Sequence, residues 1–163
     1  MTDAAEVYRA QAAPAAIEAS LATKTPKAVV GTLNEDGTIH LAFVIFLYEN
    51  GRFYFETSSL TKKARNAAAR PTASFAIEGP GFMAMAEGTA QVIAGDEAKA
   101  INARLRAKYL TPEARGSVGE AWGELDDVAV EITPVKWRSW SAEKFRDLTV
   151  EAADGADVWL PDD

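Results

Sequence analysis

The sequence predicts a mainly β protein, in which six antiparallel strands form one barrel accompanied by a few short helices. Runs rich in β-branched and aromatic residues recur along the chain, and tight-turn signals separate the first three of these runs. The helical segments between the remaining runs are few and short. Strands that follow one another in this way favour an antiparallel barrel over a βαβ arrangement.

The predicted strands begin with a three-stranded meander. Asp36-Gly37 and Asn50-Gly51 are strong turn signals, and each joins two β-rich runs. Gly88 lies inside the fifth run, where it indicates a bulge or the close approach of another backbone. The six predicted strands cover residues 27–33, 38–48, 52–57, 72–78, 82–93 and 127–133.

The predicted helices are less regular than the strands. Residues 4–12 are a weak helical candidate, and Pro14 stands at the start of a better one over 15–21. A third helix begins after the N-cap residue Thr61 and ends before Pro71, because proline disfavours helical geometry in the residue that precedes it.

Two further helices and one domain complete the prediction. The helices cover 96–109 and 111–125, and the second has a predicted buried face of Val118, Ala121, Trp122 and Leu125. We interpret residues 1–163 as a single domain with a core over about 15–141 and an acidic tail over 142–163.

The composition excludes several classes of function. The chain has no cysteine, which rules out disulfides and thiolate metal sites, and its single histidine speaks against a zinc enzyme or a Ser-His-Asp hydrolase. A net charge of −7 argues against nucleic-acid binding. No run reaches the ~18 apolar residues of a membrane span, and the acidic N-terminus lacks signal-peptide features. We expect a cytoplasmic protein with no metal, nucleic-acid or membrane partner.

The second predicted strand is apolar on both faces, which indicates a partner subunit. Ile39, Leu41 and Phe43 alternate with Val44 and Phe46 on the opposite face, whereas a sheet with one solvated face needs apolar residues on one side only. A second copy of the chain is the expected cover, which makes the protein a homodimer. The alternative is that helices of the same chain cover this face.

The stretch from Thr57 to Asn66 concentrates groups that bind anions. The start of a helix offers unpaired N–H groups and a partial positive charge, and three cations lie at or near it. A compact anion, most plausibly a phosphate, fits this combination. The alternative is a solvated helix with ordinary surface lysines, and the local sequence favours neither. The groups concerned are the hydroxyls of Thr57, Ser58 and Thr61 and the charges of Lys62, Lys63 and Arg65.

The order of these elements resembles the pyridoxamine 5′-phosphate oxidase-like, FMN-binding split-barrel superfamily. The resemblance is also strong to its actinobacterial branch of flavin- and deazaflavin-dependent reductases, and it covers roughly residues 15–141. The motifs that carry it are Thr57, Thr61-Lys62-Lys63-Ala64-Arg65-Asn66, Pro71-Thr72-Ala73-Ser74-Phe75, Ala86-Glu87-Gly88-Thr89-Ala90-Gln91, Arg106-Ala107-Lys108-Tyr109-Leu110 and the ending from Ile132 to Trp140.

The resemblance implies an antiparallel split β-barrel that binds an isoalloxazine-type cofactor at a homodimer interface, with the phosphate near residues 61–66. Thr57, Lys62 and Lys63 match cofactor-contacting positions, and Arg65 and Asn66 match the deazaflavin branch. Trp140 matches the position of a tryptophan that lies against the flavin, although core or interface packing is an equal alternative. Trp137 falls on the opposite side of the same segment, so the two should not share a role.

Three departures argue against genuine oxidation of pyridoxamine or pyridoxine phosphate. His40 occupies the place of a phosphate-binding arginine, so a cofactor contact there competes with a structural role. Ile45 stands where the oxidases have a substrate-contacting lysine. The residues after Trp140 lack the Arg-x-His substrate motif.

The resemblance therefore implies a flavin- or deazaflavin-dependent oxidoreductase that transfers hydride to or from a small conjugated substrate. The ring supplies the redox chemistry, so no acid–base pair or nucleophile is required, and no catalytic residue is assigned. FMN is placed slightly ahead of the deazaflavin coenzyme F420. The alternative from a different class is a non-catalytic protein that stores or senses a flavin or haem.

Overall fold

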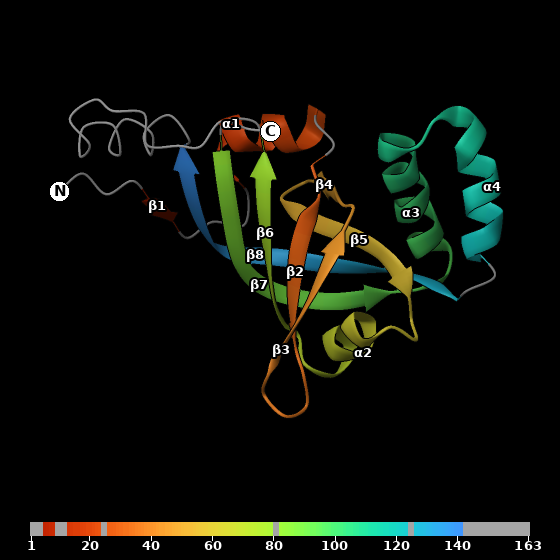
Figure 1. Ribbon diagram of the computed structural model, residues 1–163, viewed down its shortest axis with the longest axis horizontal. Helices are drawn as coiled ribbons and strands as arrows, with labels where there is room; N and C mark the ends of the chain where they lie inside the picture. The colour runs from red at the N-terminus through yellow and green to blue at the C-terminus, as the bar shows by residue number, and fades with distance from the viewer. Residues whose placement is uncertain (1–4, 9–12, 24–25, 80–81, 124–125, 142–163) are drawn as a thin grey trace, which may run out of the picture.

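The computed structural model describes residues 5–8, 13–23, 26–79, 82–123 and 126–141 (Figure 1). Within them the chain forms one eight-stranded sheet and four helices. The strands are β1 (Ala5–Tyr8), β2 (Ala28–Leu33), β3 (Ile39–Val44), β4 (Leu47–Glu49), β5 (Arg52–Ser58), β6 (Thr72–Gly79), β7 (Phe82–Ile93) and β8 (Asp127–Ser141). The helices are α1 (Ala15–Thr23), α2 (Lys62–Ala69), α3 (Gly95–Tyr109) and α4 (Pro112–Gly123).

The sheet curls into a half-barrel whose two end strands are consecutive in sequence. Its order is β3-β2-β6-β7-β8-β5-β4, and β1 pairs with β8 outside this path. Every strand pairing is antiparallel. Only Ile45 and Phe46 separate β3 from β4, so the chain crosses from one end of the sheet to the other there (Figure 1). The predicted antiparallel split-barrel class is confirmed.

The strand count differs from the predicted six for two reasons. The predicted strand 38–48 is divided at Ile45, because no single straight strand can belong to both ends of a curled sheet. The predicted weak helix over 4–12 is wrong, since residues 5–8 form β1. Pairing with the edge of β8, from Ala5 opposite Trp140 to Tyr8 opposite Trp137, overrides the helical propensity of the alanines.

Aromatic rings fill the inside of the half-barrel. Phe53 stacks on Phe75 with ring centroids 4.2 Å apart and on Phe46 at 4.8 Å. Trp137 meets Phe75 edge-on at 5.3 Å, and these rings are almost entirely buried. Burial of each such side chain stabilises the fold by roughly 1.5–3 kcal/mol, so this cluster holds the curled strands together.

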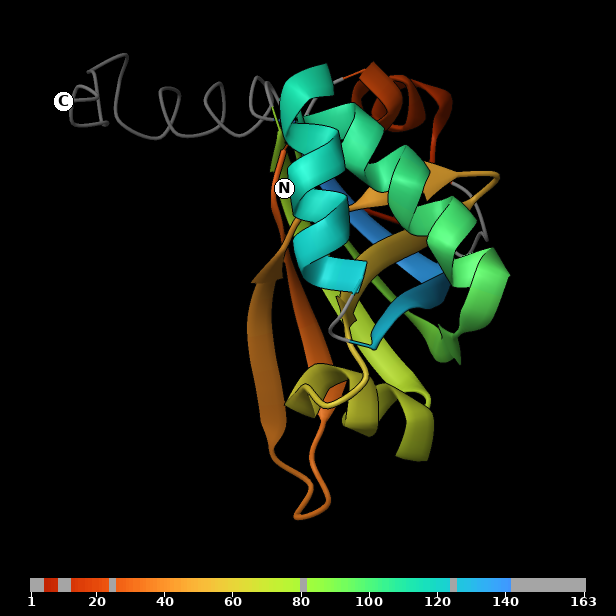
Figure 2. The ribbon, with the colours of Figure 1, turned by 90° about the vertical axis from the view of Figure 1, so that its right-hand side faces the viewer.

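The helices cover one side of the barrel and its ends. α1 lies across one end, and α3 packs against β8, β5 and β4 with α4 outside it (Figures 1 and 2). Arg106 of α3 forms ion pairs with Glu56 and, at 3.2 Å, with Asp127. None of the described helices is long and apolar enough to cross a membrane.

The buried face predicted for the helix over 111–125 is largely wrong. Ala121 is exposed and Trp122 is 37% exposed, because the described part of α4 packs on α3 and not on the sheet. The Trp122 ring instead lies 5.6 Å from the Arg106 guanidinium, which is a cation–π contact at the surface. Leu125 lies outside the described residues.

Asn66 and Arg70 hold α2 on β2. The Asn66 amide donates to Thr32 Oγ1 at 3.2 Å and to Asn34 Oδ1 at 2.8 Å, and it accepts from Arg70 at 3.1 Å. Arg70 Nε in turn donates to the Leu33 carbonyl at 2.8 Å. These contacts fix the helix beside β2, and Lys62 and Arg65 of its first turns are exposed.

A bulge at Gly88 brings β7 and β8 unusually close. The register between the two strands shifts between Glu87 and Gly88, and a Cβ on Gly88 would lie 2.3 Å from the Thr133 carbonyl oxygen. The predicted bulge or close backbone approach at this glycine is confirmed. The bulge leaves Val135 outside the register, and it accommodates Pro134, which cannot donate a ladder hydrogen bond.

We predict that Gly88→Ala lowers the free energy of unfolding by about 2 kcal/mol, because the added methyl group forces the two backbones apart. Urea denaturation measures the change. Gly116→Ala is the control, since an added Cβ there meets nothing within 4 Å, and it should raise stability by up to ~1 kcal/mol. Equal stability of Gly88→Ala and the native chain would contradict the close approach.

We also predict that Asn66→Ala destabilises the fold by about 2 kcal/mol and speeds hydrogen exchange in α2, because it leaves buried partners such as Thr32 unpaired. Arg65→Ala on the exposed side of the same helix should change stability by no more than ~0.5 kcal/mol. If the two variants proved equally stable, Asn66 would not anchor the helix.

Candidate functional site

The start of α2 is built by hydroxyl groups at the end of β5. Thr61 is the N-cap, and its Oγ1 accepts from the Ala64 N–H at 3.4 Å. Thr57 Oγ1 lies 3.0 Å from Thr61 Oγ1, and Ser58 Oγ accepts from the Leu60 N–H at 3.2 Å. The predicted hydroxyls therefore shape the turn into the helix. Within the described residues, the N–H groups of Lys62 and Lys63 have no protein acceptor.

Three cations extend from this turn without an ion pair among the described residues. Lys62 and Arg65 are exposed and Lys63 is half-buried. Lys63 precedes Asn66 and Ala67 by three and four residues, so it lies on the helix stripe that faces the sheet. Burial lowers the pKa of its ammonium group below the ordinary value, which is the sign of a charge that lacks water and an acidic neighbour.

A polar cleft of about 740 Å³ separates α2 from the β2–β3 turn. Lys62, Arg65 and Asn66 line one side of it, and Glu35 and Asp36 line the other. The cleft therefore presents cations from the helix and carboxylates from the turn. The carboxylates of the turn repel an anion, whereas Lys62 and Arg65 attract it. An anion is therefore bound most strongly on the helix side of the cleft, away from the β2–β3 turn.

His40 lies next to the α2 group, on the inner side of β3. It pairs with Thr32 across the β2–β3 ladder, and paired residues project to the same side of a sheet. Thr32 is also the residue that Asn66 contacts. His40 and Asn66 are therefore both neighbours of Thr32.

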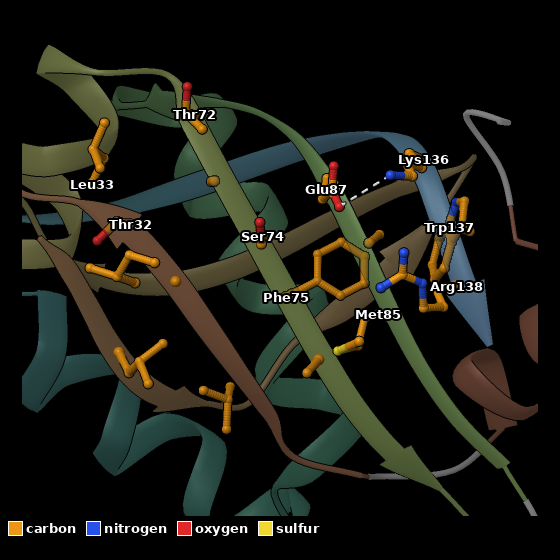
Figure 3. A pocket seen from close by; sticks show the side chains of 17 residues that line it. Thr32, Leu33, Thr72, Ser74, Phe75, Met85, Glu87, Lys136, Trp137 and Arg138 are labelled. Atoms are coloured by element: carbon orange, nitrogen blue, oxygen red, sulfur yellow. Dashed lines mark ion pairs between the residues drawn. The ribbon is translucent and has the colours of Figure 1, made fainter. Parts of the chain in front are cut away.

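The outer face of the sheet carries a second, apolar cleft of about 360 Å³ (Figure 3). It crosses β3, β2, β6, β7 and β8 and has small residues on its floor, including Gly31, Ser74 and Ala76. Ile39, Leu41 and Phe43 of β3 stand beside it and are 69%, 65% and 82% exposed. No described element of the chain covers these three side chains, so the alternative of cover by the chain's own helices fails for the described residues.

The two tryptophans of β8 lie on opposite sides of the sheet, as predicted. Trp137 is fully buried in the aromatic core, whereas Trp140 is half-buried and pairs with Met83, whose side is outward. Trp140 lies near the C-terminal end of β8. The start of α2 lies near the opposite end of β8, because it follows Ser58, which pairs with Asp127. A single copy of the chain therefore does not bring Trp140 to the start of α2.

Lys136 and Arg138 also line the apolar cleft, although neither side chain was predicted to take part in a site. The last strand was predicted to end at Thr133, whereas β8 continues to Ser141. The missed signal is the alternation beyond Pro134, in which Lys136, Arg138 and Trp140 face outward between buried Trp137 and Ser139.

The fold and site can be compared with known proteins. A conserved hypothetical protein from Mycobacterium tuberculosis is 22% identical over 95% of this chain and 96% of that one, with a TM-score of 0.70. An F420 reductase is 20% identical over 72% and 93% of the two chains, with a TM-score of 0.57. A pyridoxamine 5′-phosphate oxidase-related, FMN-binding protein from Nostoc punctiforme is 15% identical over 72% and 74%, at 0.54. At these identities the likeness concerns the fold.

The sequence profile of one family spans most of the chain. No functionally curated protein is similar enough in sequence to count as a relative. The profile described as pyridoxamine 5′-phosphate oxidase matches residues 13–141, which include strands β2 to β8, α2 and both clefts. The structural neighbours named above include an FMN-binding protein and an F420 reductase. This chain belongs to the pyridoxamine 5′-phosphate oxidase-like family of split barrels.

Proposed function

We propose that this chain is a flavin- or deazaflavin-dependent oxidoreductase that acts as a homodimer on a small, planar, conjugated substrate. The observation that carries the proposal is the group of three cations at the start of α2, which have no ion pair among the described residues. In a chain with a net charge of −7, such a group selects a local anion and not a generally anionic surface.

The residues at the start of α2 fit the phosphate of FMN or F420. Lys62, Lys63 and Arg65 supply charge, and the N–H groups of the first turn supply directed donors. When bound, the isoalloxazine or deazaflavin ring supplies the hydride chemistry. The protein's own contribution is to hold the phosphate, fix the orientation of the ring and keep water from its reacting face.

The separation of Trp140 from α2 supports a site shared between two protomers. A ring whose phosphate lies at α2 of one protomer can meet Trp140 only if the second protomer provides it. The exposed row of Ile39, Leu41 and Phe43 is the apolar surface that a second copy would cover. We therefore place the dimer on the outer face, with the substrate in a groove between the subunits.

Pyridoxamine phosphate is a poor candidate for the substrate. Ile45 is half-buried between β3 and β4 and offers no charge, and His40 replaces an arginine. FMN remains slightly ahead of F420 as the cofactor. Arg65 and Asn66 favour F420. However, the amide nitrogen of Asn66 donates to Thr32 and Asn34, and its amide oxygen accepts from Arg70. Asn66 therefore contributes to cofactor binding by holding α2 in position.

Reconstitution tests the proposed function. Purified chain is titrated with FMN and separately with F420, and the visible spectrum identifies which ring binds. The loaded protein is then assayed for steady reduction of an artificial acceptor. Cofactor binding with turnover supports an oxidoreductase. Binding without turnover indicates a storage or sensor protein, and a haem spectrum after haem addition would favour the haem-binding alternative, for which His40 is the single histidine available.

We predict that Lys63→Ala weakens binding of the cofactor that the native chain takes up by more than tenfold, because it removes a charge-assisted contact worth roughly 1.5–3 kcal/mol. Isothermal titration measures the dissociation constant. Lys99→Ala is the control, because Lys99 is exposed on α3 and paired with Asp96. Native affinity in Lys63→Ala would show that the phosphate is bound elsewhere.

We predict that Leu41→Lys shifts the protein from dimer to monomer and raises the dimer dissociation constant at least tenfold, because it places a charge in the apolar centre of the interface. Analytical ultracentrifugation gives the constant. Ala103→Lys adds the same charge on exposed α3 and should leave the assembly unchanged. A monomeric native chain, or a dimer unaffected by Leu41→Lys, would rule out this interface.

A further inference from the structure

Arg138 is the charged member of an otherwise apolar row of residues across the sheet, and Val7 of β1 lies opposite it on the far side of β8. The strand registers place five outward-facing residues side by side across the sheet, which are Phe43, Val29, Ala76, Met85 and Arg138. Adjacent strands lie about 4.8 Å apart, so the row is about 19 Å long. The four residues ahead of Arg138 in this row cannot neutralise its guanidinium group.

The acidic residue of the cleft is already engaged. Glu87 is the one acidic residue among the described residues that line the cleft. Its Oε1 lies 3.6 Å from Lys136 Nζ. Lys136 and Glu87 are directly opposed in the neighbouring row (Figure 3). The Arg138 guanidinium group has neither an ion pair nor a hydrogen bond within the described residues. The cleft therefore contains one balanced pair and one cation without a counter-charge.

The shape of the cleft suits a flat apolar body. The floor of the cleft lies low, because its residues Gly31, Ser74 and Ala76 have small side chains. Larger exposed side chains flank it, with Leu41 and Phe43 on one side and Met85 on the other. A Cβ on Gly31 would approach side-chain atoms of Ile39 and Leu41 to 3.5 Å, so a larger residue there would fill the cleft. The Arg138 side chain reaches from β8 toward Met85, at the edge of this space (Figure 3).

We propose that the outer-face cleft binds the planar part of a substrate that carries an anionic group, and that Arg138 pairs with that group. A carboxylate and a phosphate share the required chemistry, since each accepts two parallel hydrogen bonds from a guanidinium group. The inference rests on the proposed function, which places the substrate in this groove, and it narrows the substrate class to anionic conjugated molecules. Arg138 is a specificity-determining residue in this scheme.

Three bicyclic probes of similar shape test the charge requirement. 2-Naphthoate carries a carboxylate, 2-naphthyl phosphate carries a phosphate, and 2-naphthamide is neutral. Their affinities are measured by equilibrium dialysis with the full chain, first alone and then saturated with the cofactor that it binds. We expect at least one anion to bind tenfold or more tightly than 2-naphthamide, and the stronger of the two anions identifies the preferred group.

Variants assign the preference to Arg138. In Arg138→Gln the ratio of anion to amide affinity should fall to within twofold, whereas Arg138→Lys should keep part of it. Lys99→Gln is the control, because Lys99 is exposed on α3 and does not line the cleft, and it should retain the ratio. A native ratio within twofold, or an unchanged ratio in Arg138→Gln, would overturn the proposal.

Two further outcomes separate this inference from the proposed function. If the protein binds cofactor and turns over an acceptor but shows no preference for anions, the anionic subsite is wrong and the redox function stands. If the preference depends on Arg138 but neither FMN nor F420 binds, the subsite stands and the redox function fails. If Arg138→Gln dissociates the native dimer, Arg138 pairs with the partner subunit, and the subsite is wrong.

Discussion

The anchoring of α2 on β2 is the contact on which the rest of the site depends. Asn66 and Arg70 occupy the sheet side of the helix, and their hydrogen bonds to Thr32, Asn34 and the Leu33 carbonyl fix its direction. The first turn is thereby held at the end of β5 with its cations displayed. A helix of eight residues has little intrinsic stability in water, so tertiary contacts must hold it in place.

The curled sheet makes two different surfaces from one set of strands. Its inside is filled by stacked aromatic rings and needs no partner. Its outside exposes apolar side chains on β3, at one end of the sheet, and carries the charged side chains of Lys136 and Arg138 on β8. Because the basic helix and Trp140 lie at opposite ends of β8, the proposed cofactor site needs a second protomer to be complete. In this proposal the dimer contact and the substrate groove lie on the same face of the sheet.

Local turn chemistry made much of the fold predictable from sequence. Gly37, Asn50 and Gly51 adopt positive φ in the two turns that were predicted, which is the conformation these residue types tolerate. Long-range pairing was not predictable in the same way. β1 is a strand because β8 offers it an edge, and the run 38–48 is divided because the sheet curls, and neither constraint is visible in local sequence.

The candidate site was predicted in part for the same physical reasons. The residues from Thr57 to Asn66 are contiguous, so one helix start gathers them. The apolar cleft combines residues from five strands that are far apart in the sequence. Arg138 was missed because the last strand was predicted to end at Thr133, whereas β8 continues past Pro134 opposite the bulge at Gly88.

The grip of the α2 cations on a phosphate is tested most directly by comparing each cofactor with its phosphate-free form. Titration calorimetry gives the affinities of FMN and riboflavin, and of F420 and its deazariboflavin nucleus. Three charge-assisted contacts predict that the phosphate-bearing member of at least one pair binds 100-fold or more tightly, with the difference shrinking as salt is added. Equal affinities within both pairs would contradict the assignment of α2 as the phosphate site.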